Sequence, residues 1–270
     1  MGTTSGKIAI LNALEEACCI YQRGLASCQE AYRYLTEERS IKNDTIKQFR
    51  LGYALCTKSS DRNLVTKALM KKHALDSLID SGLTFIGRPD ILDYGCENSK
   101  MLYYLDRFRD HCIIIPVFNL ENEVIAFEAR NLHRDAYLKY INHPETAVFS
   151  KRQVLYGLNF AMEAINERGS VFVFEGCFDV ILAHQYKVEN SVALMGTGLH
   201  QDHFHSLKGL LPDVQIMICY DGDKAGENAA ERTKKACGVK NVNVFVVSEE
   251  MDPADVFQKY GKLEDCLIPV

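Results

Sequence analysis

The sequence predicts an α/β protein in two parts: an α+β part over residues 1–168, and a largely parallel sheet flanked by helices over residues 169–262. From Val171 onward, apolar runs of strand length alternate with helical patterns, which is typical of βαβ units. Before residue 168, helical periodicity comes first and a hairpin pattern follows. Residues 263–270 are expected to begin a C-terminal tail.

The composition excludes several classes of protein. With 270 residues, of which 47% are hydrophobic and 25% charged, the chain is typical of globular rather than disordered or fibrous proteins. No apolar run approaches the roughly 20 residues of a membrane span, and no signal-peptide pattern opens the chain, so a cytoplasmic protein without a membrane partner is expected. Ten cysteines are scattered without a C-x-x-C pair, which indicates reduced thiols rather than disulfides or zinc ligands.

The first part is predicted to begin with helices and to end with a hairpin. Apolar residues recur every three or four positions over residues 7–38, and residues 61–81 contain two further helical patterns. Two β-rich runs, 112–118 and 124–130, follow on either side of a turn. Pro116 lacks a backbone N–H, which favours an edge strand or a bulge at that position.

The second part alternates regularly between strands and helices. The strands are expected at 171–175, 191–195, 214–220 and 242–247, and the helices near 177–186, 200–211, 224–237 and from about 253. Gly196-Thr-Gly198 lies between two of these elements. Its backbone N–H groups could approach a phosphate, although an ordinary turn is the better interpretation of these three residues alone.

Acidic residues follow two of the predicted strands. Glu175 ends the first, and Asp221 and Asp223 end the third. Parallel strands present their carboxyl ends at one edge of the sheet, and carboxylates gathered there without basic partners favour a hard cation such as Mg²⁺. Each motif also has a simpler interpretation: Asp223 could cap the next helix, and Glu175 could interact favourably with the positive N-terminal end of a helix dipole. Asp252 is likewise expected to cap the last helix, a role compatible with metal binding.

Charge is distributed unevenly along the chain. Residues 1–170 contain 22 Lys and Arg against 21 Asp and Glu, whereas residues 171–270 contain 9 against 15. The imbalance fits a cleft with one metal-binding side and one phosphate-binding side, although a difference in surface charge explains the counts equally well. Arg130, Lys139 and Lys151 are candidates for phosphate contacts and Tyr140 for base stacking, with scattered solvated side chains as the alternative.

Several motifs occur together in a characteristic order. The second part contains Glu175-Gly-Cys-Phe-Asp179, Gly196-Thr-Gly198, Tyr220-Asp-Gly-Asp-Lys-Ala-Gly226 and Asp252-Pro253, and the first contains Phe49-Arg-Leu-Gly-Tyr53, Ala126-Phe-Glu-Ala-Arg130 and Lys139-Tyr-Ile-Asn-His-Pro-Glu-Thr146. Over roughly residues 10–262 this series resembles the catalytic core of bacterial DnaG-type DNA primases, with its RNA polymerase and toprim parts. The Lys-Tyr-x-Asn-x-Pro-Glu-Thr stretch is the most specific of these motifs.

The resemblance implies roles for individual residues. Residues 1–168 would form the primase N-terminal subdomain with a basic cleft, and residues 169–262 the toprim metal-binding domain. Catalytic Mg²⁺ or Mn²⁺ would be held by Glu175, Asp221 and Asp223, with Asp179 and Asp252 nearby. The template strand and the incoming nucleotide's phosphates would lie along Arg39, Arg130, Lys139, Tyr140, Asn142 and Lys151.

The implied function is metal-dependent synthesis of short RNA primers from nucleoside triphosphates on single-stranded DNA. A toprim nuclease and a catalytically inactive nucleic-acid-binding module remain as alternatives. This chain departs from the family pattern at Ser40, where glycine is common, at Glu128-Ala129, where two glycines are common, and at Ala254, where a third acid is frequent. A replicative helicase is a possible partner in the family, but no helicase-binding domain is expected in this chain.

Overall fold

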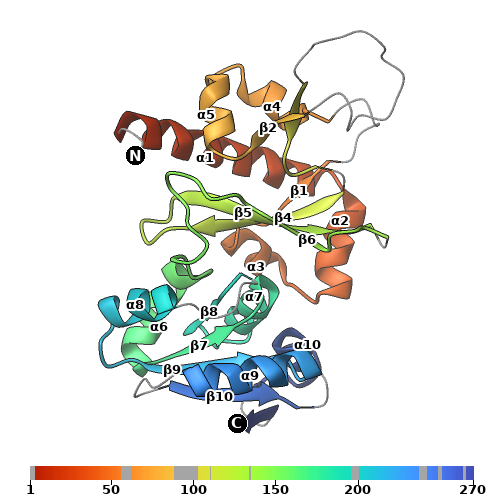
Figure 1. Ribbon diagram of the computed structural model, residues 1–270. Coiled ribbons are helices and arrows are strands. Elements are labelled where there is room, and N and C mark those ends of the chain that lie inside the picture. Colours follow the sequence, from red (N-terminus) through yellow and green to blue (C-terminus); the bar gives the residue numbers. More distant parts are fainter. Residues whose placement is uncertain are drawn as a thin grey trace. The chain divides into compact units, whose positions relative to one another are not determined.

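The computed structural model contains two compact units, each built around its own sheet (Figure 1). The structure describes residues 4–55, 62–87, 103–109, 111–133, 135–195, 201–236, 242–248, 251–263 and 266–270. Unit 1 comprises Met1–Arg33, Arg50–Val117 and Glu123–Ser150, and unit 2 comprises Tyr34–Phe49, Phe118–Asn122 and Lys151–Val270. The predicted domain ranges 1–168 and 169–262 are continuous stretches of sequence, whereas each compact unit combines several separate segments. The two descriptions are therefore not equivalent, and the domain ranges stay a prediction.

Unit 1 is an α+β assembly. Its helices are α1 (Thr4–Ala26), α2 (Gln29–Arg33), α4 (Leu64–Leu69) and α5 (Leu75–Asp80), and its strands are β1 (Gly52–Ala54), β2 (Thr84–Gly87), β3 (Tyr103–Asp106), β4 (Cys112–Phe118, whose last residue belongs to unit 2), β5 (Val124–Asn131) and β6 (Tyr140–Asn142). The main sheet has the order β1-β4-β5-β6, and β2 and β3 form a separate antiparallel pair.

The core of unit 1 forms between α1 and the main sheet. Tyr21 on the buried face of α1 packs edge-on against Phe127 of β5, with ring centroids 5.4 Å apart. Strand β1 comes so close to α1 that a Cβ atom on Gly52 would lie 2.6 Å from the Cβ atom of Tyr21. A side chain at this position would therefore push the strand away from the helix.

The predicted hairpin is present, but Pro116 does not lie on an edge strand. Strand β4 lies between β1 and β5, and all seven of its residues are buried. The three-residue strand β1 pairs with Cys112, Ile113 and Ile114, so its ladder ends before Pro116. An interior strand accommodates the proline here because the neighbouring strand is short, a length that the sequence of β4 does not reveal.

Unit 2 confirms the predicted alternation of strands and helices. Its elements are η1 (Tyr34–Glu38, a π-helix), α3 (Asn43–Gln48), α6 (Leu158–Arg168), β7 (Ser170–Phe174), α7 (Cys177–Gln185), β8 (Ser191–Ala193), α8 (Gln201–Leu210), β9 (Gln215–Tyr220), α9 (Lys224–Ala236), β10 (Val242–Val247), α10 (Pro253–Tyr260) and β11 (Leu267–Pro269). The Gly196-Thr-Gly198 turn lies outside the described residues.

The sheet of unit 2 has the order β11-β10-β9-β7-β8. The pairs β7–β8, β7–β9 and β9–β10 are parallel, and only β11 runs antiparallel to its neighbour β10. The predicted α/β class with a largely parallel sheet is therefore confirmed. Because β8 lies on one side of β7 and β9 on the other, the strand order reverses between β7 and β9, and ligands of open α/β sheets bind at such switch points.

Helices cover both faces of this sheet. Alternate residues such as Val173 and Ile218 pack against Ile165 of α6, Leu207 of α8 and Ala230 of α9. On the other face Phe174 meets Phe257 of α10, with ring centroids 6.5 Å apart, and α10 packs against α7. Burial on both faces explains why these strands are mostly apolar rather than alternating between apolar and polar residues.

Within unit 2, the Gln185 side chain joins residues 34–49 to helix α7. The Gln185 side chain at the end of α7 accepts a hydrogen bond from Lys42 N at 2.6 Å and donates one to Ser40 O at 2.9 Å. Ser40 has a backbone φ of +54°, a left-handed conformation that costs a non-glycine residue roughly 1–2 kcal/mol. This is the position where the resembling family commonly has glycine, and the structure supplies the physical reason.

Two further predictions concern the state of the cysteines and the presence of membrane-spanning helices. Cys112, Cys177 and Cys219 are buried free thiols, as expected from their apolar surroundings in the sequence. Within the part of the chain that the structure describes, no helix combines the length and the apolar character needed to cross a membrane.

Asp106 offers a test of the unit 1 fold. It is 3% exposed, and its carboxylate accepts hydrogen bonds from Val65 N at 2.8 Å, Thr66 N at 2.7 Å and Thr66 Oγ1 at 2.6 Å, at the start of α4. Asp106→Ala would leave these donors buried without partners, so we expect the free energy of unfolding to fall by about 3 kcal/mol in urea titrations. The control Asp80→Ala, at an exposed position, should change the free energy of unfolding by less than about 0.5 kcal/mol. Equal destabilisation by the two substitutions would contradict the role of Asp106 as a cap of helix α4.

Candidate functional site

The acidic residues of unit 2 gather at the reversal point of its sheet. Glu175 directly follows β7, and Asp221 directly follows β9, the two adjacent strands between which the order reverses. The backbone N–H of Asp221 donates a hydrogen bond to the Glu175 carboxylate. The sequence predicted that both residues end strands, and the structure makes those strands neighbours.

Asp221 has the most unusual environment of these residues. Its Oδ1 atom is buried without a hydrogen-bond partner. Burial, followed by the negative charges of Glu175 and Asp252, raises its pKa to about 7. Burial also raises the pKa of Glu175, and Asp223 contributes to that shift. A buried carboxylate oxygen that lacks a donor, with further carboxylates close by, provides the hard oxygen ligands that a divalent cation prefers.

Asp179 links two helix N-termini. It is 6% exposed, and its two carboxylate oxygens accept hydrogen bonds from Gly176 N at the start of α7, at 3.0 Å, and from Ala254 N at the start of α10, at 3.1 Å. Burial, with the charges of Asp252 and Asp221, raises its pKa well above the ordinary value. These contacts hold the Asp252 loop beside the carboxyl end of β7; a direct contact of Asp179 with metal stays a prediction.

The other two predicted acids cap helices. Asp223 Oδ1 accepts a hydrogen bond from Gly226 N at 2.8 Å in the first turn of α9, and Asp252 Oδ1 accepts one from Asp255 N at 2.7 Å in the first turn of α10. Both capping interpretations are therefore confirmed, and neither excludes a metal contact through the remaining oxygen lone pairs.

Close backbone packing brings these two turns together. Gly222 N donates to Met251 O at 2.8 Å, which joins the turn after β9 to the segment before Asp252. A Cβ atom on Gly226 would lie 2.1 Å from the carbonyl oxygen of Asp221, so only glycine lets α9 begin this close to the strand end. Asp221 consequently lies near Asp252 and Asp255, two residues whose charges also raise its pKa.

These acids are close but do not form a closed coordination shell. Among the described residues, no group of three or more His, Cys, Asp or Glu side chains is already arranged to hold a metal ion. Their electrostatic coupling and the unpartnered Oδ1 atom of Asp221 nevertheless fit a divalent cation, because mutual repulsion keeps carboxylates apart until a cation offsets their charge. The residues present therefore fit the metal that the sequence predicted, and the ligand set stays a prediction.

Four of the predicted nucleic-acid contacts come together on the β5–β6 hairpin of unit 1. Arg130 pairs with Tyr140 across the strands, and its guanidinium carbon lies 4.9 Å from the centroid of the Tyr140 ring. The Arg130 Nε and Nη1 atoms are buried without hydrogen-bond partners. Asn142 is paired with Glu128 in the same ladder, and the exposed Lys139 immediately precedes β6. The hairpin thus presents positive charge and an aromatic ring together.

The remaining two predicted contacts, Arg39 and Lys151, belong to unit 2. Arg39 donates to Tyr34 Oη at 2.9 Å, and its guanidinium carbon lies 4.9 Å from the Phe178 ring centroid on α7. This contact places a cation next to the helix that carries Asp179. Lys151 is anchored through its carbonyl oxygen, which accepts a hydrogen bond from His203 of α8 at 3.2 Å. The sequence reasoning did not find the roles of Phe178 and Gln185, because both contact residues more than 130 positions away.

Comparisons with known proteins agree on one family. Residues 172–257 match the family model described as Toprim-like, which is the class of α/β domain that the sheet and its acidic edge define. Residues 20–162 match the model "DNA primase catalytic core, N-terminal domain". The chain therefore belongs to the DnaG-type DNA primase catalytic core family.

Individual relatives support this assignment. The DNA primase of Helicobacter pylori strain J99 is 35% identical over 249 residues, which cover 92% of this chain but only 41% of the relative. The RNA polymerase domain of Mycobacterium tuberculosis primase DnaG matches in structure with a TM-score of 0.81 and 30% identity, covering 97% of this chain and 81% of that one. A DnaG primase catalytic domain bound to single-stranded DNA matches with a TM-score of 0.75 and 26% identity, covering 96% and 77%.

The raised pKa of Asp221 has a consequence for stability. A carboxyl group whose pKa is higher in the folded protein than in the unfolded chain binds its proton more tightly when folded. Protonation of Asp221 therefore stabilises the folded state at low pH, and this stabilisation is lost as the pH rises from about 4 through about 7. In EDTA, we expect the Tm of the wild type to fall more between pH 5 and pH 8 than that of Asp221→Asn. Asp213→Asn, at an exposed position, should follow the wild type. If the Tm of the wild type and that of Asp221→Asn depended on pH in the same way, the raised pKa of Asp221 would be contradicted.

Proposed function

We propose that this chain acts as the catalytic core of a DNA primase, a nucleotidyltransferase that makes short RNA primers from nucleoside triphosphates on a single-stranded DNA template. The family assignment supports this reaction, as does the similarity to a primase domain solved with single-stranded DNA. The chain spans less than half the length of the H. pylori primase, so the activity, substrates and partners of the longer relatives are part of the proposal. We also propose that the protein is cytoplasmic.

One observation carries the proposal: the buried Asp221 Oδ1 atom has no hydrogen-bond partner at the reversal point of the parallel sheet, beside Glu175. Leaving such an atom buried and unsatisfied is costly, and its retention is explained by a ligand that binds there. Burial and the charges of the neighbouring acids raise the pKa of Asp221, and this negative surrounding favours a cation over another anion as the missing partner.

We infer that Glu175, Asp221 and Asp223 hold Mg²⁺ or Mn²⁺, with Asp179 and Asp252 supporting them. When bound, such a cation supplies the positive charge that activates a primer 3′-hydroxyl and stabilises the charge on the transferred phosphate. Asp179 holds the starts of α7 and α10 at fixed positions. The family's frequent third acid is replaced by Ala254, whose backbone N–H donates to Asp179, so this position contributes to the site through its main chain alone.

The β5–β6 hairpin supplies the complementary charge. The unpartnered Nε and Nη1 atoms of Arg130 are donors for phosphate oxygens, and guanidinium geometry suits phosphate. Lys139 is exposed next to Arg130's cross-strand partner Tyr140, and Asn142 lies two residues further along β6. We propose that these residues, with Arg39 and Lys151, bind the template backbone and the triphosphate of the incoming nucleotide. A replicative helicase is a possible partner, as in the sequence prediction.

Primer synthesis tests the metal assignment. With single-stranded DNA, labelled nucleoside triphosphates and Mg²⁺ or Mn²⁺, we expect the wild type to make short RNA products and Asp221→Ala to reduce their rate on the order of 100-fold or more. Asp202→Ala, an exposed acid in the first turn of α8, should retain the rate. Unchanged synthesis by Asp221→Ala would disprove the metal role. Cleavage of the DNA without primers would instead support the nuclease alternative.

Charge reversal at Lys139 tests the basic hairpin. We expect Lys139→Glu to weaken binding of single-stranded DNA, and to lower the slope of log K against log salt by about one, because a phosphate contact and its released counterion are lost. Lys67→Glu, on the exposed side of α4, serves as the control for net charge. Mn²⁺ affinity, measured by calorimetry, should be the same in both variants; a loss specific to Lys139→Glu would place this residue at the metal site instead.

A further inference from the structure

Two histidines lie next to each other at the open end of the β4–β5 hairpin in unit 1. His111 directly precedes β4 and His133 follows β5, and their ring centroids are 5.0 Å apart. The backbone joins the two positions, because Leu132 N donates a hydrogen bond to His111 O at 3.0 Å. Neither histidine belongs to the acidic site of unit 2 or to the predicted nucleic-acid contacts, so their arrangement calls for a separate explanation.

His111 is held in one orientation. Its side chain is 14% exposed, and its Nδ1 atom contacts Tyr53 Oη on β1 at 2.5 Å. A hydroxyl group can accept a hydrogen bond from Nδ1–H, which leaves the lone pair of Nε2 to bind a ligand, and metal-bound histidines are usually fixed by such a partner. Burial lowers the pKa of His111, so the neutral ring that binds metals is the form present near neutral pH.

A carboxylate faces the Nε2 atom of His111. Glu30 on the short helix α2 places its Oε1 atom 3.5 Å from Nε2. In a tetrahedral zinc site, with bonds of about 2.0–2.1 Å, two ligand atoms lie about 3.4 Å apart. The observed distance is therefore close to the spacing of two ligands on one zinc ion, and it is longer than a charge-assisted hydrogen bond, for which about 2.7–2.9 Å is usual.

The distance between the two imidazole rings fits the same geometry. When two imidazoles bind one tetrahedral zinc ion, each ring centroid lies about 3.2 Å from the metal, which places the two centroids about 5 Å apart. The centroids of His111 and His133 are separated by 5.0 Å. Within the part of the chain that the structure describes, the His133 ring makes no hydrogen bond, so its nitrogens are able to bind a ligand.

We propose that His111, His133 and Glu30 bind a divalent transition-metal ion of the zinc type at the open end of the β4–β5 hairpin. Imidazole nitrogens suit such ions, whereas the Mg²⁺ proposed for the acidic site prefers oxygen ligands. The ion joins α2 to the ends of β4 and β5, so its role is structural. It is separate from the primer synthesis proposed for the chain, and neither proposal depends on the other.

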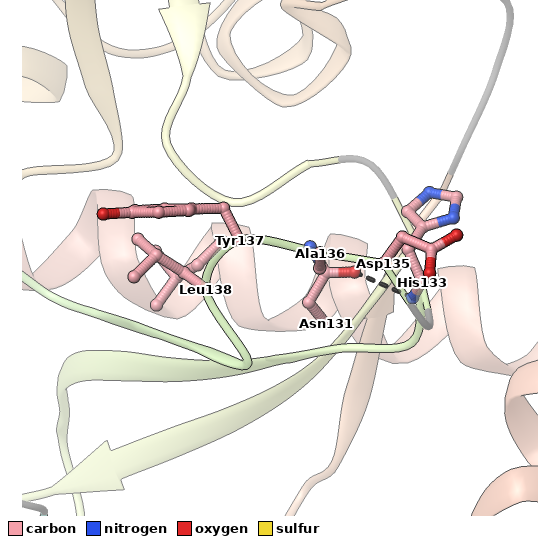
Figure 2. Close-up of a pocket in the computed structure, with 7 residues that line it drawn as sticks. Asn131, His133, Asp135, Ala136, Tyr137 and Leu138 are labelled. Atoms are coloured by element: carbon pink, nitrogen blue, oxygen red, sulfur yellow. Dashed lines mark hydrogen bonds between the residues drawn. The ribbon is translucent and has the colours of Figure 1, made fainter.

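Rotation of exposed side chains completes the site. Among the described residues, no three such side chains already enclose a metal ion. The Glu30 side chain is 77% exposed and His133 is also exposed, so both can turn toward His111 without disturbing the core. Asp135 is a further exposed carboxylate that lies with His133 at one end of the loop between β5 and β6, whereas Tyr137 lies at the other end (Figure 2). Asp135 or water can take the fourth position.

Calorimetry with Zn²⁺ tests the proposal. Excess Mg²⁺ occupies the oxygen site of unit 2, and a reductant keeps the thiols reduced. We expect His133→Gln to lower the Zn²⁺ affinity about tenfold or more, since even the loss of a partner behind a ligand typically costs that much. The control His73→Gln changes another histidine of unit 1, which contacts Glu16 at 3.0 Å, and should bind like the wild type. Equal Zn²⁺ affinities of the wild type and His133→Gln would overturn the proposal.

Absorption by bound Co²⁺ identifies the ligands. Four-coordinate Co²⁺ with nitrogen and oxygen ligands absorbs visible light far more strongly than six-coordinate Co²⁺, and thiolate ligands add a band in the near ultraviolet. In excess Mg²⁺ we expect the wild type to show the visible bands without the thiolate band, and His133→Gln and Glu30→Gln to weaken them. A thiolate band, or visible bands unchanged in both variants, would place the ion at other residues and contradict the proposal.

Thermal unfolding separates metal binding from a simple ion pair. An ion that binds only the folded chain raises its Tm, so Zn²⁺ in excess Mg²⁺ should raise the Tm of the wild type and of His73→Gln more than that of His133→Gln. If Glu30 and His111 form an ion pair and nothing more, Zn²⁺ shifts the Tm of all three proteins equally, and the metal site is wrong. Circular dichroism checks that each variant is folded, and the exposure of His133 makes its substitution compatible with the fold.

Discussion

The unit 2 site depends on one electrostatic constraint: several carboxylates are held close together where the parallel sheet reverses its strand order. Burial and mutual repulsion raise the pKa values of Glu175, Asp179 and Asp221, so the apo arrangement is costly at neutral pH. The fold tolerates the cost because Asp179, Asp223 and Asp252 accept hydrogen bonds from helix N-termini, where backbone N–H groups offset negative charge. Among the acidic residues that the structure describes, only Asp221 has a buried oxygen without a hydrogen-bond donor, and this is where a cation would contribute most.

The same carboxylates therefore serve both the fold and the proposed chemistry. Asp179 joins the starts of α7 and α10, and the Gly222–Met251 hydrogen bond joins the turns after β9 and before α10. These contacts explain why acids from three separate strand ends reach one place. They also imply that mutating Asp179 would disturb the site through its geometry, whether or not that residue contacts a metal.

The two arginines among the predicted nucleic-acid contacts lie over aromatic rings: Arg39 lies over Phe178, and Arg130 lies over Tyr140. The electrostatic attraction between a guanidinium group and an aromatic face contributes to the position of each charge.

The sequence by itself determined the α/β class, the alternating strands and helices from β7 to α10, and the fact that Glu175 and Asp221 end strands, because these follow from local periodicity. Its family motifs also predicted which acids and cations make up the proposed site. Only the tertiary structure decided that β7 and β9 are neighbours, that Asp179 caps two helices, that Pro116 lies on an interior strand, and that residues 34–49 pack onto α7 through Gln185 and Phe178. These features depend on contacts between residues far apart in the chain, and local sequence patterns contain no information about strand order or about which distant side chains will meet.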